Sequence, residues 1–136
     1  AFGRLADWIG PLQAWLLASA WQTVLVFGFT RLESLGGFTT YALIYGFGYA
    51  GVMTGVLATA RALAPPARRA SVLGIVMVFA WAGHGTGGLQ GGFFFDLTGG
   101  YGWTFANAAF AGIANLAILG MLWWLINRPR GVPATA

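Results

Sequence analysis

The sequence contains no cysteine, no lysine and very little charge of either sign. Charged residues make up 7% of its 136 positions, whereas a typical soluble domain has about 25%. A chain so poor in charge cannot cover a water-facing surface, so a soluble globular domain is excluded. The absence of cysteine also excludes disulfides and thiolate metal sites.

Groups that support catalysis or bind metals are equally scarce. One histidine, His84, and three carboxylates, those of Asp7, Glu33 and Asp96, are all that the sequence offers. They leave no metal cluster, no catalytic triad and no phosphate-binding loop between a strand and a helix. We therefore expect neither an enzyme nor a cofactor. The arginines lie at the ends of apolar runs instead of on one basic face, which argues against a nucleic-acid partner.

What the sequence does have is long apolar runs, with 58% hydrophobic residues. Charges and prolines divide it into four such runs, which predict helices over about residues 9–30, 36–62, 70–95 and 102–127. About 20 apolar residues cross the hydrocarbon core of a bilayer, so each run is long enough for one crossing. The expected fold class is all-α integral membrane, with four transmembrane helices in contact with the lipid bilayer.

The arginines predict the orientation of these helices. With four crossings, both termini and the central connection share one side, which holds six of the seven arginines and one acid, Asp7. The positive-inside rule places this side in the cytoplasm. We therefore expect a protein of the inner (plasma) membrane with both termini cytoplasmic.

Glycine is concentrated in the second and third runs, and tryptophan in the first and fourth. Gly83, Gly87 and Gly91 recur every four residues, which is the small-xxx-small pattern of closely packed membrane helices. We therefore predict that neighbouring helices pack tightly on these three glycines. The two middle helices are predicted to be buried in protein, and the outer two to face lipid in part.

Polar residues inside the runs are the candidate site residues. His84 lies about midway along the third run, and an ionisable group in a membrane could carry a proton or pair with an anionic substrate. The alternative is a neutral histidine bonded to a backbone carbonyl or a neighbouring hydroxyl. Tyr45 and Tyr49 could line an aqueous cavity or simply pack. Gln90 could hold a polar substrate or bond the backbone.

Two asparagines in the last run carry a structural interpretation instead. Asn107 and Asn115 lie about two turns apart, and we expect them to form hydrogen bonds between helices. Gln22, in the first run, is interpreted in the same way.

Three segments resemble the major facilitator superfamily of transporters. Gly3, Arg4 and Asp7, followed by Gly10, resemble its cytoplasmic loop motif, although Trp8 stands where the motif prefers arginine. The basic, proline-containing segment 61–69 resembles the loop between its tenth and eleventh helices. The segment 88–99, GLQGGFFFDLTG, resembles the end of the eleventh helix in bacterial carriers similar to monocarboxylate transporters.

The resemblance covers essentially the whole chain and implies that residues 1–136 are helices nine to twelve of a secondary active carrier. These helices would form part of a six-helix bundle, and the partners would be the missing N-terminal helices of the same carrier. The implied function is transport of a small organic anion such as a monocarboxylate, by proton symport and alternating access. The alternative is a stand-alone four-helix membrane protein that acts as an oligomeric scaffold or small exporter.

Overall fold

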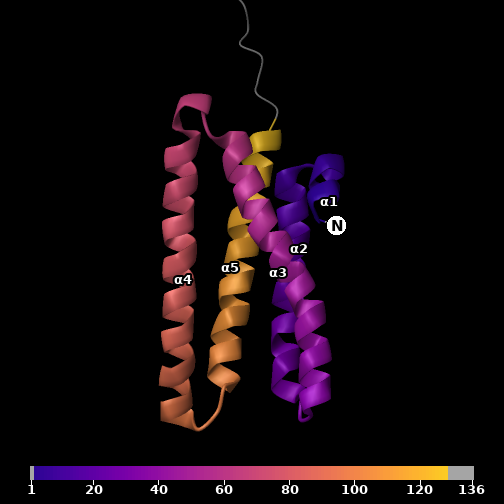
Figure 1. Ribbon diagram of the computed structural model, residues 1–136, viewed down its shortest axis with the longest axis vertical. Coiled ribbons are helices and arrows are strands. Elements are labelled where there is room, and N and C mark those ends of the chain that lie inside the picture. The colour runs from indigo at the N-terminus through magenta and orange to yellow at the C-terminus, as the bar shows by residue number, and fades with distance from the viewer. Residues whose placement is uncertain (1, 129–136) are drawn as a thin grey trace, which may run out of the picture.

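The computed structural model describes residues 2–128, and within this range every regular element is helical (Figure 1). Four helical stretches are long and apolar enough to cross a membrane, which confirms the all-helical membrane class. They lie at Pro11–Arg31, Leu35–Leu63, Pro66–Thr98 and Gly102–Asn127. The elements in chain order are α1 (Phe2–Ile9), α2 (Pro11–Leu25), the 3-10 segment η1 (Val26–Arg31), α3 (Leu35–Leu63), η2 (Pro66–Arg68), α4 (Arg69–Thr98) and α5 (Gly102–Asn127).

Local chemistry sets the helix ends. Gly10 has a φ of 96°, a conformation that glycine adopts most easily, and Pro11 then starts α2 at the position where its missing N–H costs nothing. At the start of α3, the Ser34 hydroxyl accepts a hydrogen bond from the Gly37 N–H at 3.1 Å, a normal N-cap. Gly99 ends α4 in the left-handed conformation, with a φ of 70°. The predicted helix over residues 9–30 is thus formed by α2 and η1, and Gly10 separates it from a short helix, α1, that was not predicted.

The helices run alternately up and down (Figure 1). The α3–α4 connection, α1 and the end of α5 share one end of the molecule, and the α2–α3 and α4–α5 connections share the other. Five arginines therefore belong to the first end: Arg4, Arg61, Arg68, Arg69 and Arg128. The second end carries Arg31, Glu33 and Asp96, while Arg130 lies outside the described residues.

The centre of the bundle is α2, which packs against α1, α3 and α5. Ala14, Ala18 and Ser19 are buried on it, whereas α4 has no buried residue at all. The prediction that the third membrane helix is buried is therefore wrong for this chain.

The first membrane helix is partly exposed, as predicted, at Leu17 and Val24, but it lies at the centre of the bundle instead of outside. The tryptophans of α2 suggested a lipid-facing helix, but Trp15 and Trp21 lie at the contact with α3, against Gly55 and Gly48.

Close helix packing occurs on the glycines of α3 instead of those of α4. A Cβ added at Gly55 would lie 2.5 Å from Trp15 Cβ and 2.9 Å from Trp15 Cα, so α2 and α3 are nearly in backbone contact. By contrast, a Cβ at Gly83 or Gly87 would meet nothing within 4 Å, and one at Gly91 would meet only Thr104 Cγ2 at 3.9 Å. No described helix makes the tight packing predicted at Gly83, Gly87 and Gly91. A glycine row shows that a helix can be approached closely, but not which surface approaches it.

Candidate functional site

The structure brings two of the predicted site residues together about halfway along α3 and α4. Tyr49 lies fourteen residues from either end of α3, and His84 lies near the middle of α4. The Tyr49 hydroxyl and His84 Nε2 are 2.5 Å apart, within hydrogen-bonding distance. Because both side chains lie at mid-helix, this bond joins α3 to α4 at the depth of the bilayer centre.

The partner of the second ring nitrogen identifies the tautomer of the neutral imidazole. His84 Nδ1 lies 2.7 Å from the Ala80 carbonyl oxygen, and a carbonyl can only accept a hydrogen bond. Nδ1 therefore carries the hydrogen and donates it to Ala80. In the neutral ring this leaves Nε2 with a lone pair, which accepts the Tyr49 O–H.

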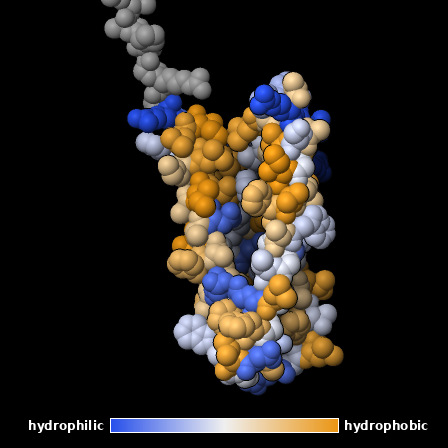
Figure 2. Space-filling model, turned by 90° about the vertical axis from the view of Figure 1, so that its left-hand side faces the viewer, coloured by the Kyte–Doolittle hydropathy of each residue, from blue (hydrophilic) through white to orange (hydrophobic). Residues whose placement is uncertain are grey.

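The surroundings of this pair are open on one side. His84 is exposed and Tyr49 is 42% exposed, and the Trp81 ring centroid lies 5.7 Å from that of His84. Figure 2 looks at the face of the molecule that carries α4, where hydrophobic side chains are interrupted by polar ones and the surface is hollowed at mid-height. The pair therefore sits at a surface that is open to lipid, to a partner or to an aqueous cavity.

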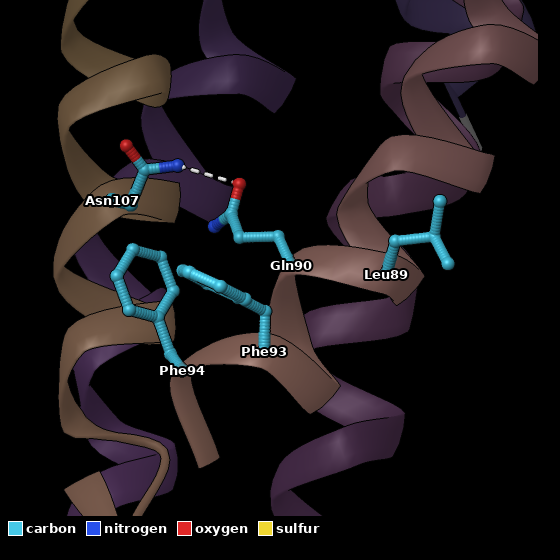
Figure 3. Close-up of a pocket in the computed structure, with 5 residues that line it drawn as sticks. All are labelled: Leu89, Gln90, Phe93, Phe94 and Asn107. Atoms are coloured by element: carbon cyan, nitrogen blue, oxygen red, sulfur yellow. Dashed lines mark hydrogen bonds between the residues drawn. The ribbon is translucent and has the colours of Figure 1, made fainter. Parts of the chain in front are cut away.

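Gln90 pairs with a residue of the next helix. Its Oε1 accepts a hydrogen bond from Asn107 Nδ2 at 2.9 Å, which links α4 to α5 (Figure 3). The two amides border an open depression of about 480 Å³, together with Leu89, Phe93 and Phe94. Figure 3 shows the two phenylalanine rings beside the amide pair and Leu89 directed away from it. Gln90 bonds a side chain here, and not the backbone.

Tyr45 faces a different part of the bundle from Tyr49. Its ring meets the Phe29 ring edge-on, with centroids 5.2 Å apart. It also lines a small cavity between α2, α3 and α5, with Ser19, Gln22, Thr23 and Asn115 among the other lining residues. Tyr45 and Tyr49 therefore do not line one common cavity.

The two asparagines behave as predicted. Asn107 bonds Gln90, and Asn115 Nδ2 donates to Ser19 Oγ at 3.1 Å, so each joins α5 to another helix. Within residues 2–128, by contrast, the Gln22 side chain forms no hydrogen bond, so the interhelical bond predicted for it is not made. Sequence reasoning missed the cavity, although Ser19, Gln22 and Thr23 lie three and four residues apart, as expected for one face of a helix.

The residues of the loop motif lie on α1 and at its end. Arg4 and Asp7 are exposed and line a shallow depression with Leu5 and Trp8. The Gly10 N–H donates to the Ala6 carbonyl at 3.0 Å, which closes the last turn of α1. Gly3 has open space around it. Packing of α1 comes instead from Phe2, whose ring lies 4.9 Å, centroid to centroid, from that of Phe47 near the middle of α3.

Among the described residues, no group of three histidine, cysteine or acidic side chains is placed to hold a metal ion. The polar groups near mid-membrane are a histidine, tyrosines and amides, which suit hydrogen bonding and proton transfer. Comparison with protein-family models, curated proteins and solved structures finds no match for this chain.

Proposed function

We propose that this chain is the C-terminal part of a secondary carrier of the major facilitator type that moves a small organic anion, such as a monocarboxylate, with a proton. The observation that carries the proposal is the Tyr49–His84 pair at the middle of two membrane helices. An ionisable group at that depth is costly to keep and usually serves transport of ions or protons. The resemblance of the loop segments to that superfamily supports the same reading.

The exposure of α4 on the surface of the bundle supports a larger assembly. This helix has no buried residue, yet it carries His84, Gln90 and a row of glycines. A face of this kind is poorly matched to lipid, because the Gln90 NH₂ group forms no hydrogen bond within the described residues and glycine offers little surface for packing. The missing N-terminal helices of the carrier would cover it, and would form the other wall of a central substrate site.

The chemistry of the pair links the proton to the anion. When His84 takes up a proton at Nε2, that nitrogen becomes a donor and can no longer accept the Tyr49 O–H. The Tyr49 oxygen then accepts from His84, and the tyrosine hydrogen turns away from the ring. The protonated pair thus offers a positive charge and a free hydroxyl donor, both of which favour a carboxylate. The neutral pair offers neither.

The decisive experiment is uptake by the full-length carrier in proteoliposomes, with small radiolabelled carboxylates and an imposed pH gradient. We expect His84→Gln to abolish the stimulation of uptake by the pH gradient, because a glutamine side chain does not take up a proton near neutral pH. Tyr49→Phe is expected to weaken uptake while some proton dependence remains. Unchanged gradient-driven uptake in His84→Gln would overturn the role of His84. Liposomes that contain only residues 1–136 should show no uptake, because one wall of the site is absent.

The open face of α4 also fits a second copy of the chain, as in a small oligomeric scaffold. The size of the native polypeptide separates the two possibilities. A band several times larger than 14.3 kDa in native membranes supports the carrier. A band at 14.3 kDa, together with a dimer that crosslinks through α4, supports the scaffold and contradicts the carrier.

A further inference from the structure

A second polar site lies within the bundle and shares no residue with the Tyr49–His84 pair. It is a cavity of about 110 Å³ at the junction of α2, α3 and α5. Its polar lining consists of Ser19, Gln22, Thr23, Tyr45 and Asn115, none of which carries a formal charge. The rest of the wall consists of Val26, Val52, Ala108 and Gly112. The cavity is independent of the Tyr49–His84 pair and of any transport function.

Some of the lining groups already have partners within the protein. Ser19 Oγ accepts from Asn115 Nδ2 at 3.1 Å, and Thr23 Oγ1 donates to the Ser19 carbonyl at 2.8 Å. Within the described part of the chain, the Gln22 amide and the Tyr45 hydroxyl form no hydrogen bond to protein, although both line the cavity. Asn115 Oδ1 also remains available, since only its Nδ2 is bonded. The cavity therefore presents both donors and acceptors that need a partner.

The mixture of donors and acceptors defines the ligand. A cation would leave the Gln22 and Tyr45 donors unmatched and would lie in an apolar bundle without a counter-charge, which is expensive. An anion would face the oxygens of Asn115 and Gln22. An apolar ligand would leave the Gln22 amide, the Tyr45 hydroxyl and Asn115 Oδ1 without partners. Water donates and accepts equally well, and the cavity is well above the roughly 10–15 Å³ that a single water molecule needs.

We propose that this cavity is a binding site for ordered water that bridges α2, α3 and α5 through Gln22, Tyr45 and Asn115. Close packing keeps the cavity from collapsing or from being filled by a side chain. A Cβ added at Gly112 would lie 2.5 Å from Thr23 Oγ1, so α5 and α2 already touch at one edge of it. The water supplies the hydrogen bonds that the three helices do not make with one another.

A double-mutant cycle on the 136-residue chain in lipid nanodiscs tests this directly. Gln22→Met and Tyr45→Phe each remove a water contact without removing a protein–protein hydrogen bond. We expect each to lower Tm by about 4 °C, and the double variant to lose little more, because the shared water is lost once. The control pair is Gln22→Met with Tyr41→Phe, whose hydroxyl donates directly to the Leu25 carbonyl. The two losses in Tm of this control pair should add. If the losses of Gln22→Met and Tyr45→Phe also add, the proposal is overturned.

Two further measurements do not depend on the stability of the variants. Replacing sodium by lithium, potassium or choline at constant ionic strength should leave Tm unchanged. A shift specific to one cation would mean a cation site and would overturn the water assignment. In X-ray radiolytic footprinting, bound water should make Tyr45 severalfold more reactive than Tyr41, and Gln22→Met should remove the difference. Equal reactivity of the two tyrosines in the unaltered chain would also overturn it.

Discussion

At the scale of single residues, the hydrogen bonds of His84 settle a question that the sequence left open. A neutral histidine in a membrane was expected to bond either a backbone carbonyl or a neighbouring hydroxyl, and His84 does both, at Ala80 and Tyr49. This full satisfaction explains how the residue is tolerated at mid-membrane. It does not remove the residue from function, because the nitrogen that accepts from Tyr49 is the one that would take up a proton.

Removal of the Tyr49 hydroxyl tests this arrangement. Tyr49→Phe should weaken the contact between α3 and α4 by about 0.5–1.5 kcal/mol, the usual net value of one hydrogen bond. Equilibrium unfolding in mixed micelles measures the loss. Tyr101→Phe is the matched control, because Tyr101 lies in the α4–α5 connection and is 52% exposed. Equal stability of the two variants would contradict the Tyr49–His84 bond.

The tautomer can be observed as well, because His84 is the only histidine in the chain. In a sample labelled with ¹⁵N-histidine at a pH where the ring is neutral, we expect Nδ1 to be the protonated nitrogen. Tyr49→Phe should change the Nε2 signal more than the Nδ1 signal, since only Nε2 loses its partner. Protonation at Nε2 in the unaltered chain would show that the bonds are arranged otherwise.

At the scale of the elements, the seam between α2 and α3 decides the architecture. Gly48, Gly51 and Gly55 are buried along one face of α3, and the Trp21 indole N–H donates to the Ile44 carbonyl at 3.0 Å beside them. Helices in a bilayer gain no hydrophobic free energy from meeting each other, so close contact and hydrogen bonds of this kind hold them together.

The two glycine rows should respond differently to alanine. Gly55→Ala places a methyl group against the Trp15 backbone, and we expect a loss of about 1–3 kcal/mol, as for overpacked cores. Gly87→Ala meets open space and should cost nothing in this chain, which makes it the control in the same unfolding measurement. A loss at Gly87 equal to that at Gly55 would mean that α4 packs as tightly as α3. If the proposed carrier has further helices that cover α4, Gly87→Ala should cost stability there.

At the scale of the whole molecule, α4 stands at the edge of a bundle centred on α2 (Figure 1). Its side chains are joined to the rest by two polar contacts, Tyr49 with His84 and Asn107 with Gln90. The arginines lie mainly at one end of the same molecule. The packing is therefore asymmetric from one side of the bundle to the other, with α4 exposed, and the charge is asymmetric from one end of the helices to the other.

The charge asymmetry predicts the orientation in the membrane. The chain has no cysteine, so single cysteines can be placed without background. A cysteine at Ala67, in η2, should be protected from a membrane-impermeant maleimide in intact cells. A cysteine at Gly100, between α4 and α5, should react, because the positive-inside rule places it outside. Reaction at Ala67 with protection at Gly100 would invert the topology.

The sequence by itself determined the class of protein, four membrane helices near residues 9–30, 36–62, 70–95 and 102–127, and the end of the bundle that gathers arginine. These properties are local, since length and hydropathy decide whether a segment crosses a bilayer and its own backbone satisfies the hydrogen bonds. Only the tertiary structure decided that α2 is central, that Gly55 packs while Gly87 does not, and that Tyr49 meets His84 while Tyr45 faces a polar cavity. Lateral packing in a membrane depends on the shape and polar groups of two helices at once, so no single run of sequence contains it.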